Sequence, residues 1–161
     1  ADWVVTLVAL GARIVLRSPR GERTIEADGL MLGAYTTVLE ADELIVAIHV
    51  PSETPTTRWG NHKVCGKPGE FAEASAAVYF DVSRKRARVV LGAADGPPIL
   101  LNEFAAEVAS KGAQAAGRDK VSAAVGLALP DRDGIDRKLF TACVERALEQ
   151  SDVFSNHKLA E

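Results

Sequence analysis

The stretch that decides the fold spans residues 39–51 and reads Leu39-Glu40-Ala41-Asp42-Glu43-Leu44-Ile45-Val46-Ala47-Ile48-His49-Val50-Pro51. It begins as an acidic connector and continues as an apolar run that ends at a proline. The run is too short for an ordinary helix, and its β-branched residues favour a strand. Proline stops the run, because it restricts the residue before it and lacks an N–H donor. The sequence therefore predicts a strand over Leu44–Val50.

Upstream of this strand the pattern predicts a short helix and then a β-hairpin. Gly11 ends the helix, since glycine is the usual residue just past a helix C-terminus. Residues 18–21, Ser-Pro-Arg-Gly, are typical of a turn. The predicted pieces are a helix, two strands, a brief turn or helical piece, and a loop with Tyr35: Trp3–Leu10, Ala12–Arg17, Glu22–Glu26, Ala27–Leu32 and Gly33–Thr37.

Downstream, residues 51–57 hold two prolines, three threonines and a serine, which mark the best internal boundary. The boundary separates about 50 residues from about 100, both within ordinary domain sizes. The second piece is predicted as a three-stranded antiparallel sheet followed by three helices. The strands are Arg58–Cys65, Ser75–Val82 and Arg86–Ala93; Asn102 and Asp119 are expected to cap the first two helices, and the third is Ile135–Gln150. The whole is an α/β (α+β) fold.

Composition excludes several classes of protein. The 161 residues are 47% hydrophobic and carry a net charge of −3, so a core is expected and a nucleic-acid backbone binder is not. No apolar run approaches the roughly 20 residues of a membrane helix, and no secretory signal pattern begins the sequence. Cys65 and Cys143 fit no metal-binding spacing and are expected to be reduced thiols, which makes the cytoplasm the default location.

Few residues point to chemistry by themselves. His49, His62 and His157 are not spaced as metal ligands, and we expect surface or structural roles for them. The acidic residues of the connector favour a solvated loop over a catalytic carboxylate pair. The stretch 58–71 combines two lysines, three glycines, a proline and two aromatic residues. It is either a strand with a glycine turn or part of an anion-binding site.

Four segments in register resemble a known family: residues 21–25, 32–35, 39–51 and 62–72. Together they are similar to the second FAD subdomain and the following strand in carbon monoxide dehydrogenase and xanthine dehydrogenase flavoproteins. The remaining strands and helices are similar to the C-terminal domain of the same subunit. The chain therefore resembles the C-terminal half of the FAD-binding medium subunit of the molybdenum hydroxylases. The resemblance implies an incomplete FAD-binding domain over 1–54 and a C-terminal flavoprotein domain over 55–161.

The resemblance also implies a function. In this family, electrons pass from [2Fe–2S] clusters on a small subunit through FAD on the medium subunit to an external acceptor. The electrons come from a molybdopterin cofactor on the large subunit. The expected cofactor is thus FAD, and the expected partners are those small and large subunits.

Three family FAD positions match residues of this sequence: Asp2, Ile45 and Lys63. The resemblance implies that Asp2 bonds the cofactor, that Ile45 contacts the flavin ring, and that Lys63 lies near the ring. A cation there would favour the electron-rich reduced flavin. No catalytic residue and no metal ligand is predicted.

The sequence departs from the family pattern in lacking the first FAD subdomain and the Gly-Gly-Asn loop before Asp2. Glycine loops allow close backbone contact with a pyrophosphate. We therefore expect this chain alone to bind FAD weakly or not at all and to be inactive in isolation. We also expect exposed apolar surface where the first subdomain would pack. The alternative is a flavin-free assembly or binding module of the same fold; a free-standing hydrolase or transferase has no readable nucleophile–base pair.

Overall fold

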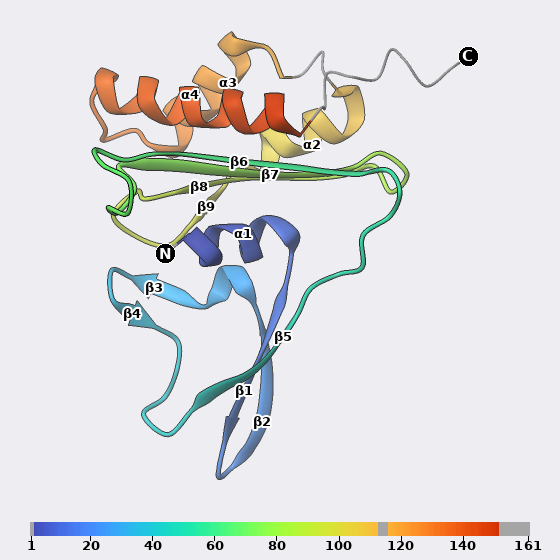
Figure 1. Cartoon of the computed structure of the whole chain (residues 1–161), viewed down its shortest axis with the longest axis vertical. Helices are drawn as coiled ribbons and strands as arrows, with labels where there is room; N and C mark the ends of the chain where they lie inside the picture. Colours follow the sequence, from blue (N-terminus) through green and yellow to red (C-terminus); the bar gives the residue numbers. More distant parts are fainter. Residues whose placement is uncertain (1, 113–115, 152–161) are drawn as a thin grey trace.

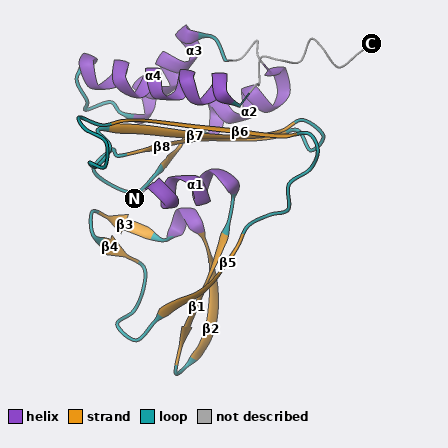
Figure 2. Ribbon diagram, in the orientation of Figure 1, coloured by secondary structure: helices purple, strands orange, loops and turns teal. Residues whose placement is uncertain are grey.

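A computed structural model describes residues 2–112 and 116–151 (Figures 1 and 2). The tail after Ser151, which includes His157, lies outside these residues. The N-terminal elements are α1 (Asp2–Leu10), β1 (Arg13–Ser18), β2 (Gly21–Glu26), the 3-10 turn η1 (Ala27–Gly29), β3 (Met31–Gly33), β4 (Thr36–Thr37) and β5 (Leu44–His49). The predicted helix, hairpin and apolar strand are confirmed. The loop predicted over 33–37 instead contains the small β3–β4 pair.

The first sheet has the strand order β2-β1-β5, with both pairings antiparallel. Its inner face is carried by β1, where Ile14 and Leu16 are fully buried. β5 lies at an edge of this sheet, and most of its apolar side chains are exposed. The strand was predicted correctly, but its tertiary context leaves it less covered than its apolar sequence suggests.

The second sheet contains the three predicted strands, β6 (Thr57–Val64), β7 (Ala74–Asp81) and β8 (Arg86–Gly92), all antiparallel. It also contains a fourth strand, β9 (Ile99–Leu100), which the sequence analysis did not predict. β9 has only two residues and follows Pro97 and Pro98, so no alternating pattern marks it. The sheet is therefore four-stranded rather than three-stranded, in the order β6-β7-β8-β9.

Helices cover both faces of the second sheet. The predicted three helices, α2 (Asn102–Lys111), α3 (Arg118–Ala128) and α4 (Gly134–Gln150), lie on one face, and α1 lies on the other (Figure 1). α4 supplies the centre of the main core, including Phe140 and Leu148. A second core joins α1 and β1 to Ala77 and Val90 of the sheet. This second core contains residues from before and after the predicted domain boundary at residues 54 and 55. The boundary stays a prediction.

The helix starts differ from expectation. Asn102 and Asp119 do not cap their helices; Leu101 and Gly117 take those positions, and neither makes a side-chain capping bond. Asp133 caps α4 instead, accepting from the N–H groups of Ile135 and Asp136. Both misplaced caps fall one residue or two late, within the usual uncertainty of helix ends. None of the helices in 2–112 and 116–151 is long and apolar enough to cross a membrane.

The link between β5 and β6 is anchored at a buried carboxylate. Asp81 accepts hydrogen bonds from Thr54, Thr56, Ser83 and the Arg84 N–H. Burial acts to raise the pKa of Asp81, but these hydrogen bonds outweigh it and lower the pKa to about 2. The linker is thus held against the turn between β7 and β8.

Asp81→Asn should lower stability at neutral pH, because the amide replaces an acceptor-only group with one that must also donate. The native pKa lies below the unfolded value of about 3.9, so the stabilisation is complete above pH 4 and disappears as pH falls toward 2. The gap in unfolding free energy between the wild type and the variant should therefore narrow across that window. Urea unfolding at several pH values measures it; a gap independent of pH contradicts the assignment.

Candidate functional site

The fold brings together two of the three predicted site residues. Asp2 begins α1 and Lys63 lies near the end of β6, 61 positions later, yet Lys63 Nζ donates to Asp2 Oδ2 at 2.6 Å. Both side chains remain partly open to solvent. The hydrogen bond to Asp2, followed by its negative charge, raises the pKa of Lys63, so the ammonium stays charged.

Asp2 and Lys63 come into contact because α1 packs on the second sheet. Val4, Val5 and Val8 of α1 are buried. A Cβ at Gly92 of β8 would overlap the Val5 side chain, so a glycine there allows the helix to lie close. At the far end of α1, Arg88 Nε donates to the Val8 carbonyl at 2.9 Å, which is the favourable place for a cation at a helix C-terminus.

A hollow of about 300 Å³ lies beside the ion pair. Its polar lining combines a cation, a carboxylate, an amide and two hydroxyls, from Lys63, Asp2, Asn61, Thr6 and Ser75. Such groups can donate to carbonyl and ring-nitrogen acceptors and can accept from N–H groups. The hollow is therefore equipped to hold the polar edge of a heterocycle.

Asn61 lines the hollow beside Lys63 and was not predicted as a site residue. The signal was present, because residues two apart in a strand share a face. His62 points to the other face, where its Nε2 lies 3.3 Å from Nη1 of Arg146 in α4. Partial burial, and then the charge of Arg146, lower the pKa of His62. The ring of His62 thus packs against α4, although His62 is also among the residues that line the hollow.

Ile45 lies in β5, opposite Leu16 of β1, and does not line the hollow. Figure 1 shows this sheet extending away from the second sheet. Ile45 is 39% exposed, and other apolar side chains of β5 are exposed beside it. The role of Ile45, like those of Asp2 and Lys63, stays a prediction.

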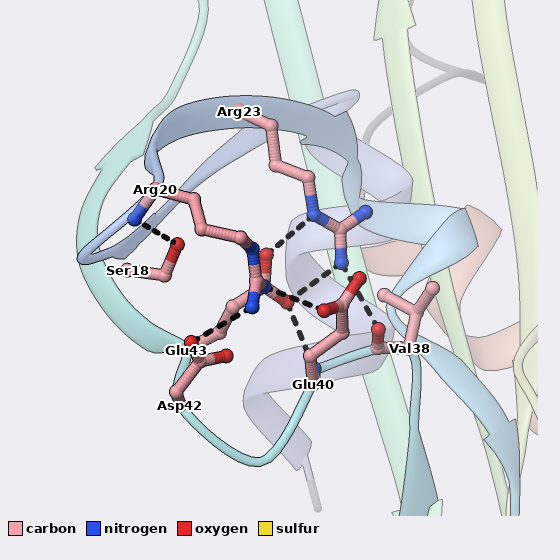
Figure 3. A network of polar contacts seen from close by, with 7 residues as sticks. All are labelled: Ser18, Arg20, Arg23, Val38, Glu40, Asp42 and Glu43. Carbon is pink, nitrogen blue, oxygen red and sulfur yellow. Dashed lines mark hydrogen bonds and ion pairs between the residues drawn. The ribbon is translucent and has the colours of Figure 1, made fainter.

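The acidic connector is a loop in which Glu40 and Asp42 are exposed, as expected, but Glu43 is buried. Arg23 binds Glu43 through two nitrogens, at 2.6 and 2.7 Å, and also donates to the Val38 carbonyl at 3.0 Å (Figure 3). Arg20 binds Glu40 at 2.5 Å and Asp42 at 2.8 Å. The burial of Glu43 was not expected because its partner Arg23 comes from the hairpin, which only tertiary folding places beside the connector.

Glu43 is the buried member of this network, with 4% of its side chain exposed. The hydrogen bond from Arg23, and then that from the Glu40 N–H at 2.8 Å, lower its pKa to about 2. A two-pronged arginine–carboxylate pair adds geometric specificity as well as strength. The network therefore determines where the start of β5 lies.

A larger hollow, of about 770 Å³, lies between α2 and α3. Its lining is mostly apolar, with one ion pair between Glu107 and Lys120 at 3.2 Å. None of the three predicted site residues lines it. Within residues 2–112 and 116–151, no group of three or more His, Cys, Asp or Glu side chains is arranged to hold a metal ion.

Comparison with known proteins shows what this chain is similar to. Residues 1–53 match the family described as the FAD binding domain in molybdopterin dehydrogenase. The carbon monoxide dehydrogenase medium chain of Hydrogenophaga pseudoflava is 42% identical over 89 residues, which are 55% of this chain and 30% of that protein. The chain is related to the FAD-binding medium subunits of the molybdenum hydroxylases.

Another such relative is the nicotine 6-hydroxylase medium subunit of Paenarthrobacter nicotinovorans, 36% identical over 98 residues, or 59% of this chain and 34% of that one. The aligned part thus spans about a third of these medium subunits. The solved CO dehydrogenase from Oligotropha carboxidovorans matches with a TM-score of 0.79 and 26% identity, over 93% of this chain and 56% of that chain. The predicted resemblance, the fold class and the expectation of FAD in a complete subunit are confirmed.

The residues present fit part of an FAD molecule. Their donor set would suit the polar edge of a flavin ring, to which Lys63 would present a cation. The hollow is at the lower end of the range of about 300–1,000 Å³ for ligand sites. It can therefore accommodate one portion of so large a cofactor.

Proposed function

We propose that this chain is part of the flavoprotein subunit of a molybdenum hydroxylase-type oxidoreductase. Its role would be to help pass electrons from [2Fe–2S] clusters through FAD to an external acceptor. The observation that carries the proposal is the meeting of Asp2 and Lys63 at 2.6 Å. Both were matched to FAD positions, and the folded chain places them beside one polar hollow.

In this proposal Lys63 and Asp2 bind the cofactor and Ile45 provides an apolar contact. FAD, when bound, supplies a carrier that accepts electrons one at a time and releases them to the acceptor. The Lys63 ammonium would stabilise negative charge at the adjoining edge of the cofactor, since a fixed cation needs no reorganisation. Asp2 holds that ammonium in place and keeps it charged.

The partners would be a [2Fe–2S] small subunit and a molybdopterin large subunit. Support comes from the relatives, whose names describe medium chains or medium subunits. The exposed apolar side chains of β5 agree with further protein packing on the first sheet. Cys65 and Cys143 are both free, which agrees with a cytoplasmic location.

Lys63→Gln should weaken FAD binding to the complete subunit about tenfold, because a charge-assisted hydrogen bond contributes roughly this much. Lys85→Gln is the matched control, since Lys85 lies in the turn between β7 and β8 and should leave affinity unchanged. Flavin fluorescence titration of both variants measures the effect.

A complete subunit that purifies with its partners but binds no flavin would reject the proposal. The alternative, a flavin-free assembly module, predicts that outcome: a colourless protein that still binds Fe–S or molybdenum subunits. Visible absorption of the purified complex separates the two functions.

A further inference from the structure

The pairing between β5 and β1 shifts by one residue near the start of β5. Val15 lies opposite Ala47, but the next residue of β1, Leu16, lies opposite Ile45. Val46 is therefore an extra residue, a β-bulge. Only two residues of β5 pair with β1 beyond the bulge, and Ile45 is one of them.

Backbone pairing of only two residues holds the start of β5 weakly in register. A shift of one residue would place Val46 opposite Leu16 and turn Ile45 to the other face, because side chains alternate along a strand. The face that Ile45 occupies thus depends on keeping the bulge where it is. Some further interaction is needed to specify it.

The Arg23–Glu43 pair provides that interaction. Arg23 of β2 lies opposite Leu16, and Leu16 lies opposite Ile45, so these three side chains share one face of the sheet. Glu43 lies two residues before Ile45 and accepts hydrogen bonds from Nε and Nη2 of Arg23, as a bidentate pair. The Arg23–Glu43 pair, drawn in Figure 3, therefore joins β2 to the residue just before β5, and β1 lies between these two strands in the sheet.

Two further contacts make this clamp rigid. Glu43 also accepts from the Glu40 N–H at 2.8 Å, and Arg23 also donates to the Val38 carbonyl at 3.0 Å. Arg20 holds the rest of the connector through Glu40 and Asp42. The residues before β5 are thus fixed from the hairpin side along their length.

We propose that Arg23 and Glu43 are positioning residues for the flavin site: their clamp keeps β5 in its bulged register and so holds Ile45 on the face of Leu16. The inference rests on the proposed function, in which Ile45 contacts the flavin ring. It assigns to the acidic connector a role in shaping the site without touching the cofactor.

The test uses the complete flavoprotein subunit with Glu43→Gln, which keeps the shape of the side chain and removes its charge. Amide hydrogen exchange at residues 44–46 should become about tenfold faster relative to β7, because the strand end opens locally. FAD dissociation constants should rise by up to about tenfold, and by no more than in Ile45→Ala, because the clamp acts on binding only through the apolar contact of Ile45. Glu22→Gln is the matched control, since Glu22 is an exposed partner of Arg17 on the same hairpin.

Arg23→Lys provides a second variant with less risk to folding. It keeps the charge but loses the two-pronged geometry, so both measurements should move in the same direction by a smaller amount. Ile45→Ala sets the scale for losing the flavin contact itself.

Each outcome separates the two ideas. Unchanged exchange at residues 44–46 in Glu43→Gln overturns the clamp. Weaker FAD binding in Ile45→Ala, with normal binding in Glu43→Gln, also overturns the clamp but leaves the proposed function intact. Normal FAD binding in both Ile45→Ala and Lys63→Gln overturns the proposed function, and the inference with it.

Discussion

Gly60→Ala should lower the free energy of unfolding by about 3 kcal/mol, the upper part of the range for overpacking a close contact. Gly60 lies in β6 directly under α4, and a Cβ there would overlap the Ala147 carbonyl oxygen and approach Ser151 N to 2.9 Å. These are backbone atoms of a helix end, so a rotamer change cannot relieve the overlap. α4 would have to move away from the sheet.

Gly126→Ala is the matched control for this substitution. Gly126 lies inside α3, and no described heavy atom outside its own helix lies within 4 Å of a Cβ placed there. Alanine should be neutral or stabilise the protein by up to about 1 kcal/mol, since it favours helix more than glycine does. Urea unfolding followed by circular dichroism measures both; equal midpoints for Gly60→Ala and the wild type would show that α4 is not packed this closely.

Phe140→Ala should cost about 3–5 kcal/mol, the usual range for removing a buried aromatic ring. Among the residues that the structure describes, Phe140 is the largest fully buried side chain, 1% exposed, and lies on α4 within the core formed with the second sheet. The cost combines lost burial with a cavity that the surrounding strands and helices can fill only in part. Because Arg146 and Gln150 also contact β6 from α4, loosening this helix should disturb β6 along its length.

Ile135→Ala on the same helix is the control, because Ile135 is 78% exposed. Its effect should stay within about 0.5 kcal/mol, as for other surface substitutions. Thermal and urea unfolding of the two variants give the comparison. Similar losses for Phe140→Ala and Ile135→Ala would mean that α4 does not bury the face assigned to it.

The regular elements were predictable because local patterns specify them. The apolar helix before Gly11, the strand ending at Pro51 and the β7–β8 hairpin are all found within a residue or two of expectation. β9 was not predictable, since two residues show no period.

The candidate site was predictable only through resemblance. Composition and spacing of 58–71 left both an anion site and a strand with a glycine turn open, and nothing local connects Lys63 to Asp2. The ion pairs of the acidic connector were likewise not predictable from the local sequence. Its carboxylates were visible in the sequence, but Arg20 and Arg23, which pair with them, come from 20 or more residues away.

Sequence patterns were enough to predict most of the helices and strands in their order, including the apolar strand that begins at Leu44, and the resemblance to FAD-binding medium subunits. Those properties depend on short-range periodicity and on residue identity. The tertiary structure alone decided that Asp2 meets Lys63, that Glu43 is buried against Arg23, and that the start of β5 carries a bulge. Each of these depends on packing α1 on the second sheet or folding the hairpin over the connector, and long-range packing is not encoded in any local window of the chain.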